Sequence, residues 1–174
     1  MRCSVYIATS LDGFIARSDG GIDWLERVQV AGEDYGYAAF MSSVDTLVIG
    51  RNTYDLARTF DTWPYTGKRV VVLTHRPLTP VHGEEVWSGP PSEIVARLGA
   101  AKCKHAYIDG GATIQAFLAA DAITDLTLSL VPVLLGEGVR LFGKTGHDVA
   151  LRLRESKSFP SGLVQLHYGV HKIE

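Results

Sequence analysis

Two kinds of hydrophobic pattern alternate along the first two thirds of the chain. Short runs of consecutive apolar residues predict strands buried on both faces, at residues 2–9, 46–49, 69–73 and 106–108, with a shorter strand at 86–87. Apolar residues that recur every three or four positions predict helices over residues 33–43, 51–59, 91–99 and 112–119. Repeated strand–helix units indicate a mostly parallel sheet with helices packed against it.

The last third of the chain changes character. Residues 123–131, 149–159 and 163–172 predict three strands with no helix between them. In the last of these, apolar and polar residues alternate from Val164 to His171, which is typical of an antiparallel strand with one exposed face. We therefore predict one α/β domain over residues 1–174, with a mostly parallel sheet extended by a C-terminal antiparallel hairpin.

Composition narrows the class of protein. The 174 residues are 46% hydrophobic and 21% charged, which excludes a disordered chain or a coiled coil. Seventeen basic against nineteen acidic residues, with no basic block, argue against nucleic acid as a partner. The longest apolar run, residues 128–135, is far shorter than the roughly 20 residues of a membrane-spanning helix. The strand-like N-terminus does not resemble a signal peptide, so we expect a cytoplasmic protein without membrane contact.

The first predicted ligand site lies where the strand at 46–49 meets the following helix. Ligands of open α/β sheets bind at the carboxyl ends of strands, where helix N-termini also lie. Here a glycine allows close approach, and a guanidinium, an amide and a hydroxyl occupy the first helical turn: Gly50, Arg51, Asn52 and Thr53. These groups suit a phosphate. A solvated first turn without a ligand explains them equally well.

Two further junctions carry similar groups. The third strand is followed by Leu73, Thr74, His75 and Arg76. Paired glycines connect the strand at 106–108 to its helix, in the run Gly110, Gly111, Ala112, Thr113 and Ile114. Each segment alone is better explained as a basic loop or a tight turn, and neither the GxGxxG nor the P-loop motif is present. Together the junctions predict one extended ligand with several phosphates, and two arginines suit the 2′-phosphate of NADPH.

Acidic and aromatic residues suggest where a substrate binds. Asp34 begins a predicted helix, so its carboxylate either caps that helix or faces a cleft. Asp12 most simply orders a turn. Trp24, Tyr35 and Tyr54 are candidates to stack on a flat heterocycle, although aromatic side chains more often belong to the core. No GxSxG elbow or cysteine pair suggests hydrolase, metal or redox chemistry.

Several of these segments resemble one known family when they are read in order. They are SLDGFIA at 10–16, IDWL at 22–25, DTLVIGRNTY at 45–54, DGG at 109–111 and VPVLLGEG at 131–138. The chain resembles the dihydrofolate reductase-like superfamily, and within it free-standing proteins similar to the C-terminal reductase domain of RibD, the riboflavin-biosynthesis deaminase-reductase. The zinc deaminase signature of the fused proteins is absent from the sequence.

The resemblance implies a three-layer α-β-α fold and an NADPH-dependent reductase. It assigns residues 51–53 and 74–76 to the adenosine 2′-phosphate and pyrophosphate, and residues 110–114 to the remaining phosphate contacts. It places Ala8 and Ile15 beside the nicotinamide. Asp34 matches, by spacing, a carboxylate that anchors the pterin in dihydrofolate reductases and assists its protonation. A homodimer is also compatible with the family, whose segment similar to residues 132–138 often lies near a subunit contact.

We therefore predict hydride transfer to a planar heterocycle. The resemblance implies either a pterin or 5-amino-6-(5-phosphoribosylamino)uracil, an intermediate of riboflavin biosynthesis. The alternative is a protein that binds NADPH but has lost turnover. A reductase that modifies drug-like molecules would differ only in its substrate.

Overall fold

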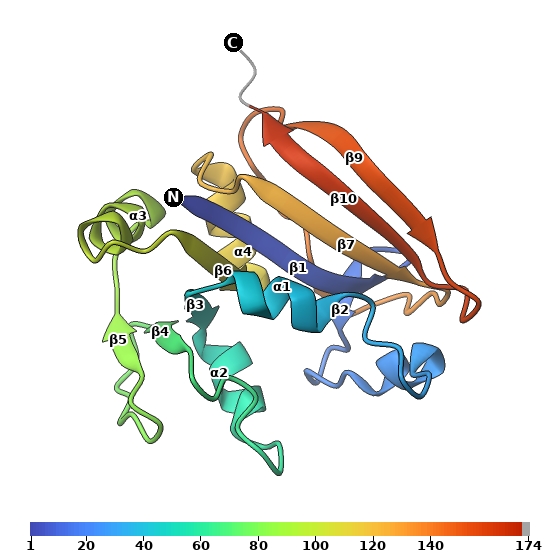
Figure 1. The fold of residues 1–174 in the computed structure, drawn as a ribbon, viewed down its shortest axis with the longest axis horizontal. Coiled ribbons are helices and arrows are strands. Elements are labelled where there is room, and N and C mark those ends of the chain that lie inside the picture. Colours follow the sequence, from blue (N-terminus) through green and yellow to red (C-terminus); the bar gives the residue numbers. More distant parts are fainter. Residues whose placement is uncertain (172–174) are drawn as a thin grey trace.

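The computed structural model describes residues 1–171 and is built on one mixed sheet (Figure 1). The eight strands lie in the order β5-β4-β3-β6-β1-β7-β10-β9. They are β1 (Arg2–Ser10), β3 (Thr46–Gly50), β4 (Arg69–Leu73), β5 (Glu85–Trp87), β6 (His105–Asp109), β7 (Asp125–Val131), β9 (Ala150–Ser158) and β10 (Val164–His171). Neighbouring strands from β5 to β7 are parallel, and only β10 runs antiparallel to its two neighbours.

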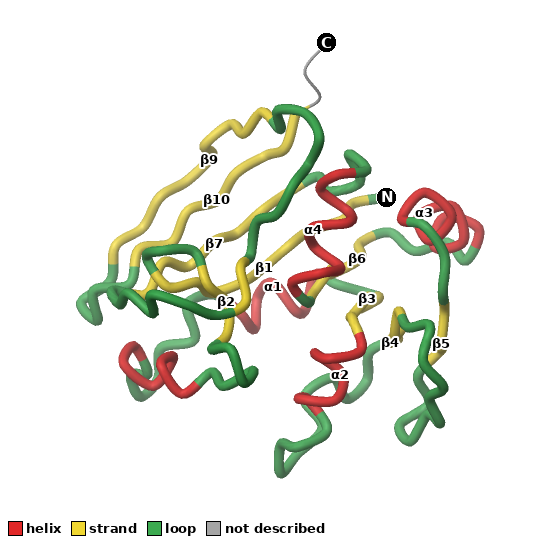
Figure 2. The backbone as a smooth tube through the Cα atoms, turned by 180° about the vertical axis from the view of Figure 1, so that it is seen from behind, coloured by secondary structure: helices red, strands yellow, loops and turns green. Residues whose placement is uncertain are grey.

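Helices cover both faces of the sheet, which gives three layers (Figures 1 and 2). On one face, α1 (Tyr37–Ser43) and α2 (Arg51–Ala57) pack on a cluster that includes Leu47 and Ile49 of β3. On the other face, α3 (Pro91–Ala100) and α4 (Gly111–Ala119) pack on a cluster that includes Val48. Adjacent residues of β3 thus face opposite cores, which explains the unbroken apolar run in its sequence.

The predicted elements are present, with ends that differ by a few residues. The mixed α/β class, the mostly parallel sheet and the C-terminal antiparallel pair are confirmed. The first helix is shorter than predicted, because Tyr35 and Gly36 both have positive φ angles of 56° and 87° and exclude a helix before Tyr37. The predicted end of the last strand, Lys172, lies outside the described residues.

Three short elements were missed by the sequence prediction. The loop after β1 contains β2 (Phe14–Ala16), which pairs with β8 (Val139–Arg140), and the 3₁₀ helix η1 (Asp23–Val28) follows. Strands of two or three residues are stabilised by contacts distant in sequence, and they leave no periodic pattern. They bring the loop that follows β1 against the segment that follows β7.

The centre of the sheet contains a topological switch point. β1 pairs with β6 only from Arg2 to Ser4, whereas it stays paired with β7 as far as Ser10. Beyond Ser4, β1 and β6 therefore separate at their carboxyl ends. The chain leads from β1 to α1 on one face and from β6 to α4 on the other. Such a point is where open α/β sheets bind ligands.

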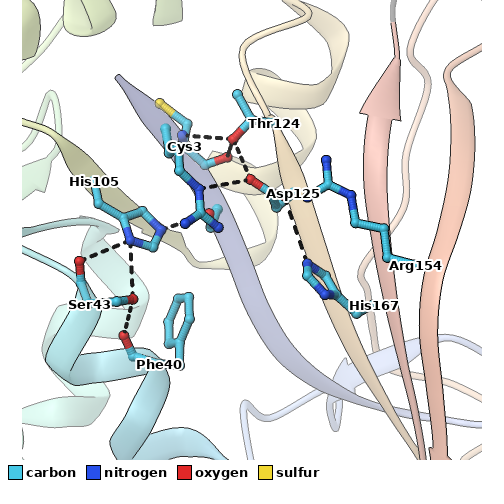
Figure 3. A network of polar contacts seen from close by, with 10 residues as sticks. Cys3, Phe40, Ser43, His105, Thr124, Asp125, Arg154 and His167 are labelled. Carbon is cyan, nitrogen blue, oxygen red and sulfur yellow. Dashed lines mark hydrogen bonds and ion pairs between the residues drawn. The ribbon is translucent and has the colours of Figure 1, made fainter.

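A polar network connects the strands at the amino ends of β1 and β7, on the side of the sheet opposite to the switch point (Figure 3). The Asp125 carboxylate, only 4% exposed, accepts hydrogen bonds from Arg2, Arg154 and Thr124 at 2.8–3.3 Å. Burial raises its pKa, but these hydrogen bonds and the two guanidinium charges outweigh burial, so the pKa stays below its usual value. This network connects β1, β7 and β9 at the starts of the two parallel strands, far from their carboxyl ends.

Candidate active site

The predicted phosphate-binding segments meet at the carboxyl edge of the sheet. The strands that precede them, β4, β3 and β6, are adjacent and parallel. Nη2 of Arg76 donates a hydrogen bond to Oδ1 of Asn52 at 3.1 Å, which connects the segment after β4 to the segment after β3. A Cβ atom on Gly50 would lie 2.8 Å from Oγ1 of Thr113, so the segments after β3 and β6 are also in contact.

Glycine is required where these turns cross. Gly110 has φ +101° and ψ 131°, and an added Cβ would lie 2.7 Å from Oγ1 of Thr53 and 3.3 Å from the Gly50 nitrogen. A Cβ on Gly111 would approach Cδ1 of Ile15 to 2.9 Å. The glycines therefore allow close packing of backbone segments at the start of α4, where the first-turn N–H groups have no partner within the helix.

These residues fit a dinucleotide that carries phosphates. Helix N–H groups, the Thr53 hydroxyl and the exposed Arg76 guanidinium lie along one edge, and groups of each kind are donors that suit an anion. Arg51 is more restrained, because its Nε is 2.9 Å from the Asp55 carboxylate and its Nη1 donates to the Pro77 carbonyl at 3.0 Å. Arg51 thus supports the loop after β4 as well as adding charge.

Ile114 requires a correction. Its side chain is fully buried in the core, and its N–H donates to the Gly110 carbonyl at 2.8 Å. Ile114 is therefore a core residue and offers no side-chain group to a phosphate. The preceding residue, Thr113, is also largely buried, with 8% of its surface exposed.

A cavity of about 630 Å³ opens beside β1. Ala8, predicted to lie beside the nicotinamide, and Asp34, predicted as the catalytic carboxylate, both line it. The rest of the lining is largely apolar. It comes from β1, η1, the segment before α1 and the first residue of α1, β7 and the residue before β10, and it includes Ile7, Leu25, Val28, Tyr37, Ser129 and Leu163. We call this the first cavity. Apolar walls with a few polar groups are typical of sites for flat heterocycles.

Asp34 both caps the helix and lines the first cavity. Its two oxygens accept hydrogen bonds from the N–H groups of Gly36 and Ala38, each at 2.9 Å. These two bonds lower the pKa of the carboxyl below its usual value, and the bond from Ala38 has the larger effect. Asp34 is therefore ionised at neutral pH. Its carboxylate suits anchoring of N–H donors better than it suits proton donation.

Tyr35, predicted to flank the substrate, lines the same cavity and is held on several sides. Its hydroxyl donates to the Val28 carbonyl and lies 2.9 Å from Oγ of Ser161. Its carbonyl accepts from the Tyr6 hydroxyl at 2.6 Å and from Nε2 of Gln165 at 3.0 Å. Sequence reasoning missed Tyr6 and Gln165. Tyr6 lies in a fully apolar run, and Gln165 was interpreted as solvent-facing.

The structure corrects three predicted substrate contacts. Trp24 is 2% exposed and Tyr54 is fully buried, so neither ring has a face free for a heterocycle. Asp12 does not line the cavity. Its carboxylate accepts hydrogen bonds from Ser10 at 2.6 Å and from the N–H groups of Leu135 and Gly136, which lower its pKa to about 2. Asp12 connects the two loops as a structural residue.

Asp109, the last residue of β6, is an additional perturbed group. Its Oδ1 accepts a hydrogen bond from the Gly110 N–H at 2.8 Å. Burial raises the pKa of its carboxyl to about 6, against which the hydrogen bonds from Gly110 and Tyr107 act only in part. Burial raises the pKa of the Tyr37 hydroxyl to about 12, and the negative charge of the Asp109 carboxylate is the second cause.

Residues 1–171 contain neither a metal-binding cluster nor a helix that could span a membrane. No group of three or more His, Cys, Asp or Glu side chains is arranged to hold a metal ion in this part of the chain. None of the described helices is long and apolar enough to span a membrane.

Known structures identify the class of the fold. A dihydrofolate reductase from Enterococcus faecalis, solved with NADP(H) and RAB-propyl, superposes with a TM-score of 0.68 at 17% identity, over 98% of this chain and 97% of that one. A putative riboflavin biosynthesis protein from Shewanella sp. PV-4 superposes with a TM-score of 0.92 at 39% identity, over 99% of this chain and all of that one. The fold is therefore that of the dihydrofolate reductase-like reductases.

The sequence match then identifies the family. The chain belongs to the RibD C-terminal domain family, whose family model matches residues 4–165. An uncharacterized Bacillus subtilis (strain 168) protein, YwjB, is 38% identical over 168 residues, which cover 94% of this chain and 95% of that one. The predicted family resemblance is confirmed.

Proposed function

We propose that the protein is an NADPH-dependent reductase that transfers hydride to a planar heterocyclic substrate, either a pterin or 5-amino-6-(5-phosphoribosylamino)uracil of the riboflavin pathway. One observation carries the proposal. The first cavity, bordered by Ala8 and Asp34, lies along β1, and β1 separates from β6 where the three phosphate-binding segments converge. The site thus offers adjoining places for a dinucleotide and for a flat substrate.

The chain's own residues bind and orient the two molecules. Thr53, Arg76 and the first-turn N–H groups of α4 hold the phosphates, and Arg76 with Arg51 favours the 2′-phosphate. Bound NADPH supplies the hydride. Apolar residues of β1 and η1 exclude water from the face of the substrate. The ionised Asp34 accepts N–H hydrogen bonds from the heterocycle and sets its orientation.

Arg76→Ala is expected to weaken NADPH binding about tenfold and to leave NADH binding unchanged, because the exposed guanidinium meets a group that only NADPH carries. Arg51→Ala is expected to weaken both cofactors, since Arg51 also holds the Pro77 carbonyl. Tryptophan fluorescence titrations with both cofactors measure the effect. Arg97→Ala, which removes a guanidinium stacked on Trp87, is the matched control. Equal affinities of the unmodified protein for NADPH and NADH would contradict the assignment.

Asp34→Asn is expected to lower kcat/KM at least about a hundredfold with an accepted heterocycle. The amide retains an acceptor for the helix cap but not the charge that orients the substrate. NADPH oxidation with a panel of pterins and aminouracils measures turnover. Glu26→Gln, which changes an exposed carboxylate of η1 that does not line the first cavity, is the control and should stay within about threefold. Full turnover in Asp34→Asn would refute the role of the carboxylate.

The competing proposal is a protein that binds NADPH without turnover. Binding of NADPH together with no oxidation across the panel would favour it. The proposal also includes a cytoplasmic location and a homodimer, and analytical ultracentrifugation tests the oligomeric state directly.

A further inference from the structure

A second cavity of about 460 Å³ adjoins the first and has a different chemistry. Its floor is one face of the three strands β7, β10 and β9. Cross-strand register arranges that face in two rows: Thr127, His167 and Glu155 form one, and Ser129, Gln165 and Lys157 form the other. All of them except Ser129, which lines the first cavity, line the second. The polar face of β10, expected from its sequence to meet open solvent, is therefore the floor of a cavity.

Aromatic rings form the walls above this polar floor. Tyr6, Tyr35, Phe40 and Phe159 line the second cavity. The Tyr6 and Phe40 rings stack with centroids 4.8 Å apart, and Tyr35 meets Phe159 edge-on at the same distance. Apolar ring faces combined with hydroxyl, amide and carboxylate groups suit a molecule that has C–H faces and several hydroxyl groups.

The charges in the lining disfavour an anion. Glu33 and Glu155 contribute two carboxylates. Lys157 is the only lysine or arginine that lines this cavity among the described residues, and its Nζ is paired with Glu155 at 3.1 Å. The His167 imidazole lies 3.8 Å from the buried Asp125 carboxylate. A phosphate or a carboxylate tail would thus meet two carboxylates and no lysine or arginine free of a partner.

The two cavities are connected by shared residues. Tyr6, Glu33 and Tyr35 line both. Nε2 of Gln165, in the second cavity, lies 3.1 Å from Oγ of Ser129 in the first, and 3.0 Å from the Tyr6 hydroxyl. Because the two cavities share these lining residues, a substituent on a heterocycle in the first cavity would extend past this hydrogen-bonded group to the floor of the second.

We infer that the second cavity binds a neutral, polyhydroxylated substituent of the substrate, so that the preferred substrate is a heterocycle with a polyol side chain and no phosphate. This inference rests on the proposed function for the position of the heterocycle. The two substrate classes that the family leaves open differ in the charge of the side chain, and the inference favours an uncharged side chain. Hydroxyl groups of the polyol donate to Glu155 and accept from Thr127 and Lys157.

Calorimetric binding of two matched series, without cofactor, tests the inference. The first is pterin, neopterin and neopterin monophosphate. The second is 6-aminouracil, 5-amino-6-ribitylaminouracil and its 5′-phosphate. In at least one series we expect the polyol compound to bind about tenfold more tightly than the bare heterocycle and the phosphorylated compound to bind more weakly than the polyol. Equal binding of all three members, or tightest binding of the phosphorylated member, would overturn this inference but not the proposed heterocycle site.

Two variants locate the effect in the second cavity. Thr127→Val is expected to reduce the preference for the polyol about fivefold without changing affinity for the bare heterocycle. Ser156→Ala removes a hydroxyl from the opposite face of β9 and should change neither affinity. Glu155→Lys should raise affinity for the phosphorylated compound about tenfold. An unchanged polyol preference in Thr127→Val would overturn the inference. Failure of both series to bind would overturn the proposed heterocycle site with it.

Discussion

Gly110→Ala is expected to lower the free energy of unfolding by about 3 kcal/mol and to weaken NADPH binding roughly a hundredfold. Two effects add at this position. A non-glycine residue is strained at φ +101° and ψ 131°, and the new Cβ would lie 2.7 Å from Oγ1 of Thr53. Relief of that overlap separates the segments after β3 and β6, which are the segments proposed to hold the phosphates. Urea unfolding and fluorescence titration measure the two losses.

Gly67→Ala separates backbone strain from the steric overlap. Gly67 has a φ of +78°, but a Cβ there meets nothing within 4 Å. We expect a loss of about 1 kcal/mol and unchanged NADPH affinity. If Gly110→Ala is no more destabilising than Gly67→Ala, the packing of the two turns is not as close as the structure indicates.

Asp109→Asn is expected to stabilise the protein by about 2 kcal/mol at pH 8 and to have little effect at pH 4. The folded-state pKa of about 6 lies above the usual aspartate value of 3.8. A difference of one pKa unit between the folded and unfolded states corresponds to about 1.4 kcal/mol of stability. Because Asp109 is partly exposed, solvent screening reduces its contribution below the value that the full pKa difference would give. The sign follows from linkage: a raised carboxyl pKa favours the folded state below the unfolded pKa, and this contribution is lost as pH rises through 6.

Urea unfolding of both proteins across this pH range tests the prediction. The amide retains the acceptor for the Gly110 N–H, so the change isolates the charge. Asp61, an exposed residue of the loop after α2, is the control, and Asp61→Asn should change stability by less than about 0.5 kcal/mol at either pH. A destabilised Asp109→Asn protein at pH 8 would show that the carboxylate is stabilised by its surroundings.

The strands and helices were largely predictable because each has a strong local pattern. The run RVVVL at 69–73 can hardly be other than a buried strand, and the spacing of Tyr37, Phe40 and Met41 predicts α1. The start of α1 was not predictable, because Tyr35 adopts a positive φ angle. Its carbonyl accepts two hydrogen bonds in this conformation. Both donors, Tyr6 and Gln165, are distant in the sequence.

The candidate site divides in the same way. Gly50, Thr53 and Gly110 were predicted to lie together because the carboxyl ends of parallel strands meet at one edge of a sheet, and the structure brings the three residues into contact. Trp24 and Tyr54 were assigned to the wrong environment, since an aromatic residue fits a core and a cavity wall equally well by sequence. Burial depends on which distant elements cover the residue.

The sequence by itself determined the fold class, the family and the edge of the sheet at which the glycines and polar groups after β3, β4 and β6 meet, because periodicity and the residues at strand ends are local properties. Only the tertiary structure decided that β1 and β6 separate beyond Ser4, that Asp34 both caps α1 and lines the first cavity, and that the polar face of β10 is a cavity floor. Each of these depends on contacts between segments far apart in the chain, and no local pattern records such contacts.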